Sequence, residues 1–142
     1  MNTSLEQSKK LVELGIDINT ADMFYADILV NDEHKYIIHP LESYGFKTFK
    51  DTKGRESNKL KFIPAWSSDA LSNILPPYLF EFERGIDLNI YPNLNGKGWH
   101  CSYMPNCIEN MKKDKFKQIT NGNTIVDAVF EMVCWLKENN KL

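Results

Sequence analysis

The chain has 142 residues, of which 42% are hydrophobic and 25% charged, and its formal net charge is −2. This length suits one ordinary domain, and the composition excludes a disordered or fibrous chain. The near-neutral charge gives no global attraction to nucleic acid or to an anionic membrane. No apolar run approaches the roughly 18 residues that span a membrane, so no membrane partner is expected. The three cysteines and the lack of a secretory signal predict a cytoplasmic protein.

The N-terminal part predicts one helix and one short strand. Thr3 and Glu6 have the spacing of a capping box, and Gly15 ends the helix that follows, with a hydrophobic residue next to it as a Schellman motif requires. The run "HKYIIHPL" predicts a short strand. Pro40 would end this strand or confine it to the edge of a sheet, because proline cannot donate to a ladder.

The middle of the chain predicts a loop and then a second helix. Residues 43–61 carry six Lys or Arg residues against two acidic ones and show no sustained hydrophobic period. We expect a flexible basic insertion there, since long loops inside compact domains are often functional. The run "IPAWSSDALSNILPP" predicts a helix that Ser67 or Ser68 caps and that Pro76 ends.

From Tyr78 onward the hydrophobic period changes from near four to two. The runs "YLFEFER", "IDLNIY" and "WHCSYM" alternate, with turn residues between them, which predicts a three-stranded antiparallel meander with one buried face. A short fourth strand is compatible with residues 116–119. The outer face of the meander is expected to carry Glu81, Glu83, Asp87, Asn89, His100 and Ser102.

The last segment predicts a helix that Asn123 or Thr124 caps. Apolar residues cover more than half of its circumference, so it is buried on more than one side or contacts a second copy of the chain in a homodimer. The predicted fold is therefore a single α+β domain over residues 1–142. Its antiparallel meander of three to four strands packs on the C-terminal helix, with two further helices in the N-terminal half.

The stretch "GWHCSYMPNC" raises the question of a metal site or a nucleophile. Neighbouring strand residues point to opposite faces, so His100 and Cys101 cannot hold one ion, and no close CxxC or HxxxH pair is present. Cys101 is expected in the core and Cys134 deep in the last helix, which leaves Cys107 as the exposed thiol. The sequence therefore predicts no metal site and no cysteine nucleophile.

Other catalytic patterns are incomplete. Asp127 and Glu131 lie one turn apart, but they fit the solvent face of an amphipathic helix better than an acid–base pair. The adjacent serines of "WSSDA" begin a helix and lack the G-x-S-x-G elbow of a serine hydrolase. No Walker or Rossmann glycine motif occurs. We therefore expect no cofactor and no catalytic residue, and an enzyme ranks last among the functions considered.

Two basic clusters are the strongest indication of an anionic partner. The first lies within 43–61, where Tyr44, Phe46 and Phe49 interleave with the cations as base stacking would require. The second lies at 112–117. The residues that we expect to contact an anion or nucleic acid are Lys47, Lys50, Lys53, Arg55, Lys112, Lys113 and Lys115. Solvated loops would explain the same lysines, and no known nucleic-acid-binding motif appears.

Three blocks carry a resemblance to a known set of proteins. "LVELGIDINTADMFY", "IPAWSSDALSNILP" and "DAVFEMVCWLKENNKL" resemble, in this order, small uncharacterised proteins of phages, prophages and mobile elements of Bacteroides-group gut bacteria. The resemblance implies a mobile-element setting and an α+β fold, and it implies no activity. The end of the chain, with "IVDAVFEMV", also resembles the last strands and helix of HicB-type antitoxins.

The function expected from the sequence is that of a non-catalytic binding or regulatory accessory protein of a phage or mobile element. It would act through contacts with a protein whose identity the sequence does not give. The alternative is a nucleic-acid-binding accessory protein that uses the basic segments 43–61 and 112–117. The alternative predicts binding that is sensitive to salt and is lost when the lysines are neutralised.

Overall fold

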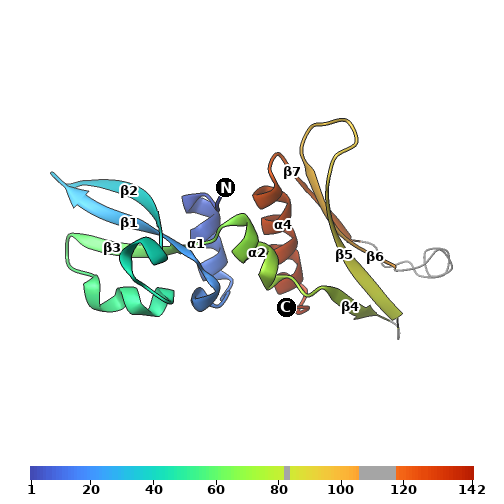
Figure 1. Cartoon of the computed structure of the whole chain (residues 1–142), viewed down its shortest axis with the longest axis horizontal. Helices are drawn as coiled ribbons and strands as arrows, with labels where there is room; N and C mark the ends of the chain where they lie inside the picture. The colour runs from blue at the N-terminus through green and yellow to red at the C-terminus, as the bar shows by residue number, and fades with distance from the viewer. Residues whose placement is uncertain (82–83, 106–117) are drawn as a thin grey trace. The chain divides into compact units, whose positions relative to one another are not determined.

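The computed structural model describes residues 1–81, 84–105 and 118–142. Within them the chain divides into two compact units, Met1–Leu71 and Ser72–Leu142. Each unit has its own antiparallel sheet together with helical segments, which confirms the predicted α+β class (Figure 1). That residues 1–142 form a single domain stays a prediction. Among the helices that the structure describes, none is long and apolar enough to cross a membrane.

The first unit begins with α1 (Leu5–Glu13), and Ser4 caps this helix. The backbone N–H of Gln7 donates to Ser4 Oγ over 3.1 Å, and the N–H of Ser4 donates to Gln7 Oε1 over 2.9 Å. The predicted box, which began at Thr3, is therefore wrong by one residue. The physical reason is that Thr3 is buried and its Oγ1 accepts from the backbone N–H of Trp66 over 3.1 Å.

The end of α1 confirms the prediction at Gly15. This glycine has φ = +77°, a left-handed conformation that L side chains rarely adopt. Its N–H donates to Val12 O and the N–H of Ile16 donates to Leu11 O, both over 3.0 Å. This pair of bonds is a Schellman motif, and it places the side chain of Ile16 in the core.

The first sheet has three strands in the order β2-β1-β3. They are β1 (Met23–Val30), β2 (Glu33–Pro40) and β3 (Leu60–Ala65), all antiparallel. Asn31 and Asp32 have φ of 51° and 62°, which gives the tight hairpin between β1 and β2 the twist of a type I′ turn. The predicted strand that ends at a proline is found at the sheet edge, whereas β1 was not predicted.

One face of this sheet carries the aromatic core of the first unit. Register places Phe24 of β1 between His39 of β2 and Pro64 of β3. Phe24 is buried and packs with Leu41 and Phe49, which belong to the connection from β2 to β3. Two short 3-10 helices, η2 (Glu42–Tyr44) and η3 (Phe49–Arg55), lie in this connection, so about half of the segment expected to lack structure is helical.

The helix α2 (Ser68–Ile74) matches its prediction and runs across the boundary between the units. Ser67 caps it, since its Oγ accepts from the backbone N–H of Ala70 over 3.2 Å. The side chain of Asp22 in turn holds Ser67, accepting from its N–H over 2.8 Å and from its Oγ over 2.5 Å. The start of α2 is thus tied to the start of β1.

The second sheet has four antiparallel strands in chain order, which confirms the predicted meander (Figure 1). They are β4 (Tyr78–Glu81), β5 (Arg84–Pro92), β6 (Trp99–Pro105) and β7 (Gln118–Gly122). The fourth strand lies close to the position that the sequence indicated.

Two details of the predicted faces are wrong. Ser102 was expected on the solvent face, but its side chain is fully buried. An outward-facing Glu81 and Glu83 imply, by alternation, an inward-facing Tyr78, yet Tyr78 is half exposed while Leu79 is buried. The pairing of Leu79 with the buried Ile86 explains the second error, because residues opposite each other across antiparallel strands share a face.

The last helix, α4 (Ile125–Glu138), packs on β5, β6 and β7. Its capping box joins Thr124 and Asp127 through two bonds of 3.1 Å. Gly122 is needed just before it, because a Cβ there would lie 2.4 Å from the backbone nitrogen of Ala128. The large hydrophobic side chains that are exposed in the described part of the chain lie outside α4. The apolar circumference of α4 is therefore mostly buried.

Candidate ligand pocket

The first unit has an aromatic pocket on the sheet face that carries Phe24. Its volume is about 280 Å³. The strands form its floor, and the η2–η3 connection forms one wall. The lining residues are Phe24, Ala26, Ile28, His39, Tyr44, Phe46, Arg55, Leu60 and Phe62.

Aromatic rings make up about half of the pocket lining, and several of them meet edge to face. Phe24 makes edge contacts with Tyr44, at 5.6 Å and 75°, and with Phe62, at 5.0 Å and 89°. Tyr44 lies nearly parallel to Phe46, with ring centres 6.4 Å apart. Tyr44 is 51% exposed, so the rings are not merely core packing: one of them stands at the opening.

Arg55 supplies a cation at the same pocket. Its guanidinium carbon lies 5.6 Å from the centre of the Phe46 ring, within the range of a cation–π contact. Among the described residues, acidic side chains lie within salt-bridge distance of His34 and of Lys53, and Arg55 has no acidic partner there. An arginine offers five donors in a fixed plane, and these remain available to a ligand.

The basic segment is held in place by its own side chains. Phe49 is buried, and the Thr52 hydroxyl donates to its carbonyl over 2.7 Å. Asp51 Oδ2 accepts from the backbone N–H groups of Lys47 and Thr48, over 3.0 and 3.1 Å. The cations next to the pocket therefore stand on an anchored turn rather than on a free loop.

The structure describes four of the seven residues that the sequence predicts to contact an anion. Lys47, Lys50, Lys53 and Arg55 are all exposed along this turn, and Arg55 lines the aromatic pocket. The side chain of Lys53 lies over the buried Phe49, at 5.6 Å. The remaining predicted contacts, Lys112, Lys113 and Lys115, lie outside the described residues.

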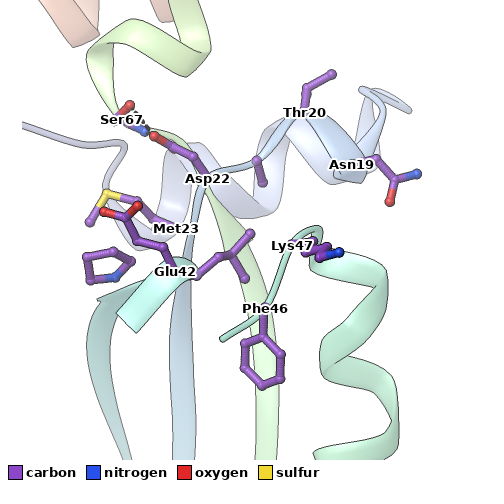
Figure 2. Close-up of a pocket in the computed structure, with 11 residues that line it drawn as sticks. Asn19, Thr20, Asp22, Met23, Glu42, Phe46, Lys47 and Ser67 are labelled. Carbon is purple, nitrogen blue, oxygen red and sulfur yellow. Dashed lines mark hydrogen bonds between the residues drawn. The ribbon is translucent and has the colours of Figure 1, made fainter. Parts of the chain in front are cut away.

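A second pocket of about 590 Å³, with a more polar lining, adjoins the first, and Phe46 lines both (Figure 2). Figure 2 shows Asp22 against Ser67, Glu42 coming from η2, and Lys47 from the segment before η3. Asn19, Thr20, Ala21, Met23, Pro40 and Leu41 complete its lining. The aromatic pocket and this more polar pocket thus share one ring, Phe46.

Sequence reasoning found part of this site. Tyr44 and Phe46 were singled out because they interleave with the lysines, and both line the aromatic pocket. Phe49, singled out with them, is instead buried and anchors the turn. Phe24 and Phe62 were missed, because they come from strands whose pairing the sequence did not reveal.

The structure gives Cys101 and Asp127 structural surroundings. Burial raises the pKa of the Cys101 thiol to about 12, which keeps it protonated and unreactive. Cys134 is buried as predicted, and Cys107 lies outside the described residues. Asp127 caps α4. Over residues 1–81, 84–105 and 118–142, no group of three or more His, Cys, Asp or Glu side chains is placed to hold a metal ion.

Comparisons with protein-family models, with curated proteins and with solved structures gave no match. The assignment of the candidate site is therefore supported by its geometry alone.

Proposed function

We propose that this chain is a non-catalytic accessory protein that binds single-stranded nucleic acid, in the mobile-element setting that its sequence resemblance implies. The observation that carries the proposal is the position of Arg55. This cation has no acidic partner among the described residues, and it stands over a ring at an open aromatic pocket.

Binding of single strands combines two physical terms, and the site offers both. Bases stack on aromatic side chains, at about 1–3 kcal/mol per base, without strong sequence preference. Lysine and arginine attract the phosphates and release counterions, so affinity falls as salt rises. Tyr44 and Phe46 provide the rings, and the turn from Lys47 to Arg55 provides the cations.

The proposal is tested with a fluorescein-labelled single-stranded 12-mer and fluorescence anisotropy in 50 and 200 mM salt. The test variant replaces Lys47, Lys50, Lys53 and Arg55 with Gln. We expect the wild-type affinity to fall with salt and the variant to bind about tenfold or more weakly, because the phosphate term grows with each neutralised charge. Circular dichroism checks that the variant is folded.

The matched control replaces four cations outside both pockets, Lys9, Lys10, Lys61 and Lys97, with Gln. It makes the same change in net charge, so it should keep most of the wild-type affinity. Equal losses in the two variants would mean that the attraction is non-specific. No wild-type binding at 50 mM salt would reject the proposal.

A specific observation also favours protein contacts, the function first expected from the sequence. β2 is an eight-residue strand at the edge of its sheet. Tyr36 and Ile37 on it are 38% and 46% exposed. Such an edge can accept an extended segment of a partner or of a second copy of the chain, since main-chain donors and acceptors stay unpaired there.

Affinity capture with and without nuclease separates the two functions. A partner that survives nuclease treatment, and is lost when Ile37→Lys places a charge on the edge, would support protein contacts through β2. Recovery that disappears with nuclease and survives Ile37→Lys would support the nucleic-acid proposal.

A further inference from the structure

The register of the first sheet determines which backbone groups of its edge strand β2 point outward. In β1 the N–H of Leu29 donates to Lys59 O over 3.0 Å, so this residue faces β3, and the alternate residues of β1 face β2. Leu29 lies opposite His34, which therefore turns its N–H and C=O away from the sheet, as do Tyr36 and Ile38. In the part of the chain that the structure describes, the outward backbone groups of these three residues have no partner.

The opposite edge of the same sheet, at β3, is closed by neighbouring segments of the chain. Its outward backbone N–H groups have acceptors except at Pro64, which has no N–H. The donors and acceptors are Leu60 with Ser57 O at 3.3 Å, Phe62 with Glu56 Oε1 at 3.1 Å and, directly after the strand, Trp66 with Thr3 Oγ1 at 3.1 Å. Among the described residues, the first unit thus blocks one edge and leaves a row of outward donors on the other, where a further strand can pair.

The outward groups of β2 are complementary to those of a second copy of the same strand. When two β2 strands pair antiparallel about Tyr36, His34 of each copy lies opposite Ile38 of the other. Each copy then donates three main-chain hydrogen bonds and accepts three. Pro40 lies opposite Asp32, which belongs to the turn before β2, so the missing proline N–H removes no bond.

The neighbouring registers that keep these outward groups facing each other are less favourable. A shift that centres the pair on Lys35 sets two like charges directly opposite each other, which destabilises a sheet. A shift that centres it on Ile37 draws Pro40 into the ladder opposite His34, whose carbonyl then has no donor. The strand therefore has one preferred antiparallel register with a copy of itself.

The side chains of β2 fit the same register. On one face, Tyr36 meets Tyr36 of the second copy and extends the stack that it forms with His34, whose ring centre is 6.1 Å away. On the other face, Glu33 lies opposite His39 of the second copy, which places a carboxylate beside an imidazole. Pairing also covers Tyr36 and Ile37, whose exposed fractions are 38% and 46%.

We infer that β2 is the interface of a homodimer, in which two first-unit sheets join through these strands into one continuous sheet with the order β3-β1-β2-β2-β1-β3. His39 lines the aromatic pocket, so each pocket lies next to Glu33 of the second copy. The inference goes beyond nucleic-acid binding and does not depend on it. The open edge is assigned to a second copy because one register satisfies the main chain, the proline and the charged side chains together.

The first test measures the mass of the nuclease-treated full chain by sedimentation equilibrium, from about 5 to about 200 µM, because two copies associate by mass action. We expect a monomer–dimer equilibrium. Tyr36→Pro removes the central outward donor and leaves the pairing with β1, since proline is tolerated at a free edge. This variant should stay monomeric and keep the wild-type circular dichroism. A wild type that is monomeric throughout, or a folded Tyr36→Pro that still dimerises, would overturn the inference.

Two cysteine variants test the register and keep the backbone intact, so they decide the matter if the proline variant does not fold. In the dimer, the two copies of residue 36 face each other at about 5.5 Å between Cα atoms, which a disulfide can span. The two copies of residue 35 lie on a diagonal, beyond the roughly 7 Å limit of a disulfide.

The variants are treated with oxidised glutathione, which accepts the two electrons and two protons that each pair of thiols gives up, and non-reducing electrophoresis measures the product. Tyr36→Cys should form a cross-linked dimer, whereas the matched control Lys35→Cys should not exceed the background that the native cysteines give in the wild type. Equal cross-linking in the two variants, or none above background in Tyr36→Cys, would overturn the inference and leave the proposed function standing.

Discussion

The two antiparallel sheets of this chain differ in what covers their apolar faces. In the second unit one continuous helix, α4, lies along the sheet, and Cys101 and Tyr103 beneath it are fully buried. In the first unit, two short 3-10 helices cover only part of the face, and an aromatic cavity of about 280 Å³ remains. The long helix α4 therefore closes the face of the second sheet, whereas the short 3-10 helices leave a pocket on the face of the first.

The covering elements follow from their sequences. α4 is 14 residues long, is free of Gly and Pro, and begins at a capping box. The connection that forms η2 and η3 is interrupted by Gly45, whose φ is +73°. Short 3-10 helices have poorer hydrogen-bond geometry and seldom run beyond a few residues, so they cannot close the face of a three-stranded sheet.

The largest difference should appear when a side chain is truncated on each face. Met132 is fully buried on α4, one turn after Ala128, and Met132→Ala should lower the free energy of unfolding by about 2–5 kcal/mol. Tyr44→Ala at the open pocket should cost less than about 1 kcal/mol, because this ring is half exposed. Urea denaturation measures both values. Equal losses would mean that the pocket ring is a core residue after all.

The second comparison adds the same bulk to each face. Ala128 lies against the turn at Gly122, and Ala128→Leu should destabilise the protein by about 1–3 kcal/mol through overpacking. Ala26 lines the aromatic pocket, where a leucine can extend into existing space, so Ala26→Leu should change stability by less than about 1 kcal/mol.

The same leucine at position 26 should also displace the bound base. We expect oligouridine affinity to fall in Ala26→Leu at unchanged thermal stability, as measured by anisotropy and calorimetry. Undiminished affinity in a folded Ala26→Leu variant would show that the base does not use this cavity.

The second unit could be predicted well from the sequence, and the first could not. The three alternating runs and the apolar last helix each carry a strong local period, and all four appear as expected. The sequence of β1 has no such sustained period. In the structure, only the second and fourth residues of this strand are buried, and the other residues are half-buried or exposed. Its place between β2 and β3 is set by tertiary pairing, which no local pattern encodes.

In the candidate site, too, some residues could be predicted from local sequence patterns and others could not. Arg55 and Lys47 were found from charge, and Tyr44 from its position among the cations. The floor at Phe24 and the carboxylate of Glu42 could not be assigned, because they join the site only when the strands pair and the chain turns back over them.

The covered face of the second sheet should also give a pH dependence. The pKa of Cys101 is raised from 9.0 to about 12 by burial, so the folded state favours the neutral thiol. The resulting stabilisation is complete below pH 9 and is lost as pH rises from 9 towards 12, at about 1.4 kcal/mol per pH unit.

Cys101→Ala isolates this contribution, since alanine cannot titrate. The difference in free energy of unfolding between the wild type and this variant should shrink by about 1.4 kcal/mol between pH 8 and pH 10, measured with urea under reducing conditions. A constant difference would show that water reaches this thiol and that the face under α4 is less tightly closed.

The smallest expected change in the free energy of unfolding comes from the capping-box carboxylates in the first turns of α4 and η3. Asp127 at α4 and Asp51 at η3 each accept backbone N–H bonds, but α4 holds a whole sheet face and η3 holds part of one. Asp127→Ala should therefore cost about 1 kcal/mol of global stability, whereas Asp51→Ala should cost about 0.5 kcal/mol or less.

Binding should show the opposite order. Asp51→Ala releases the backbone N–H groups of Lys47 and Thr48, so the cations of η3 lose their fixed position, and oligouridine affinity should fall although stability hardly changes. Asp127→Ala should leave that affinity unchanged, because α4 lies outside the unit that contains both pockets. If Asp51→Ala bound oligouridine as the wild type does, the anchored turn would be a packing element only, and the open sheet face would need another explanation.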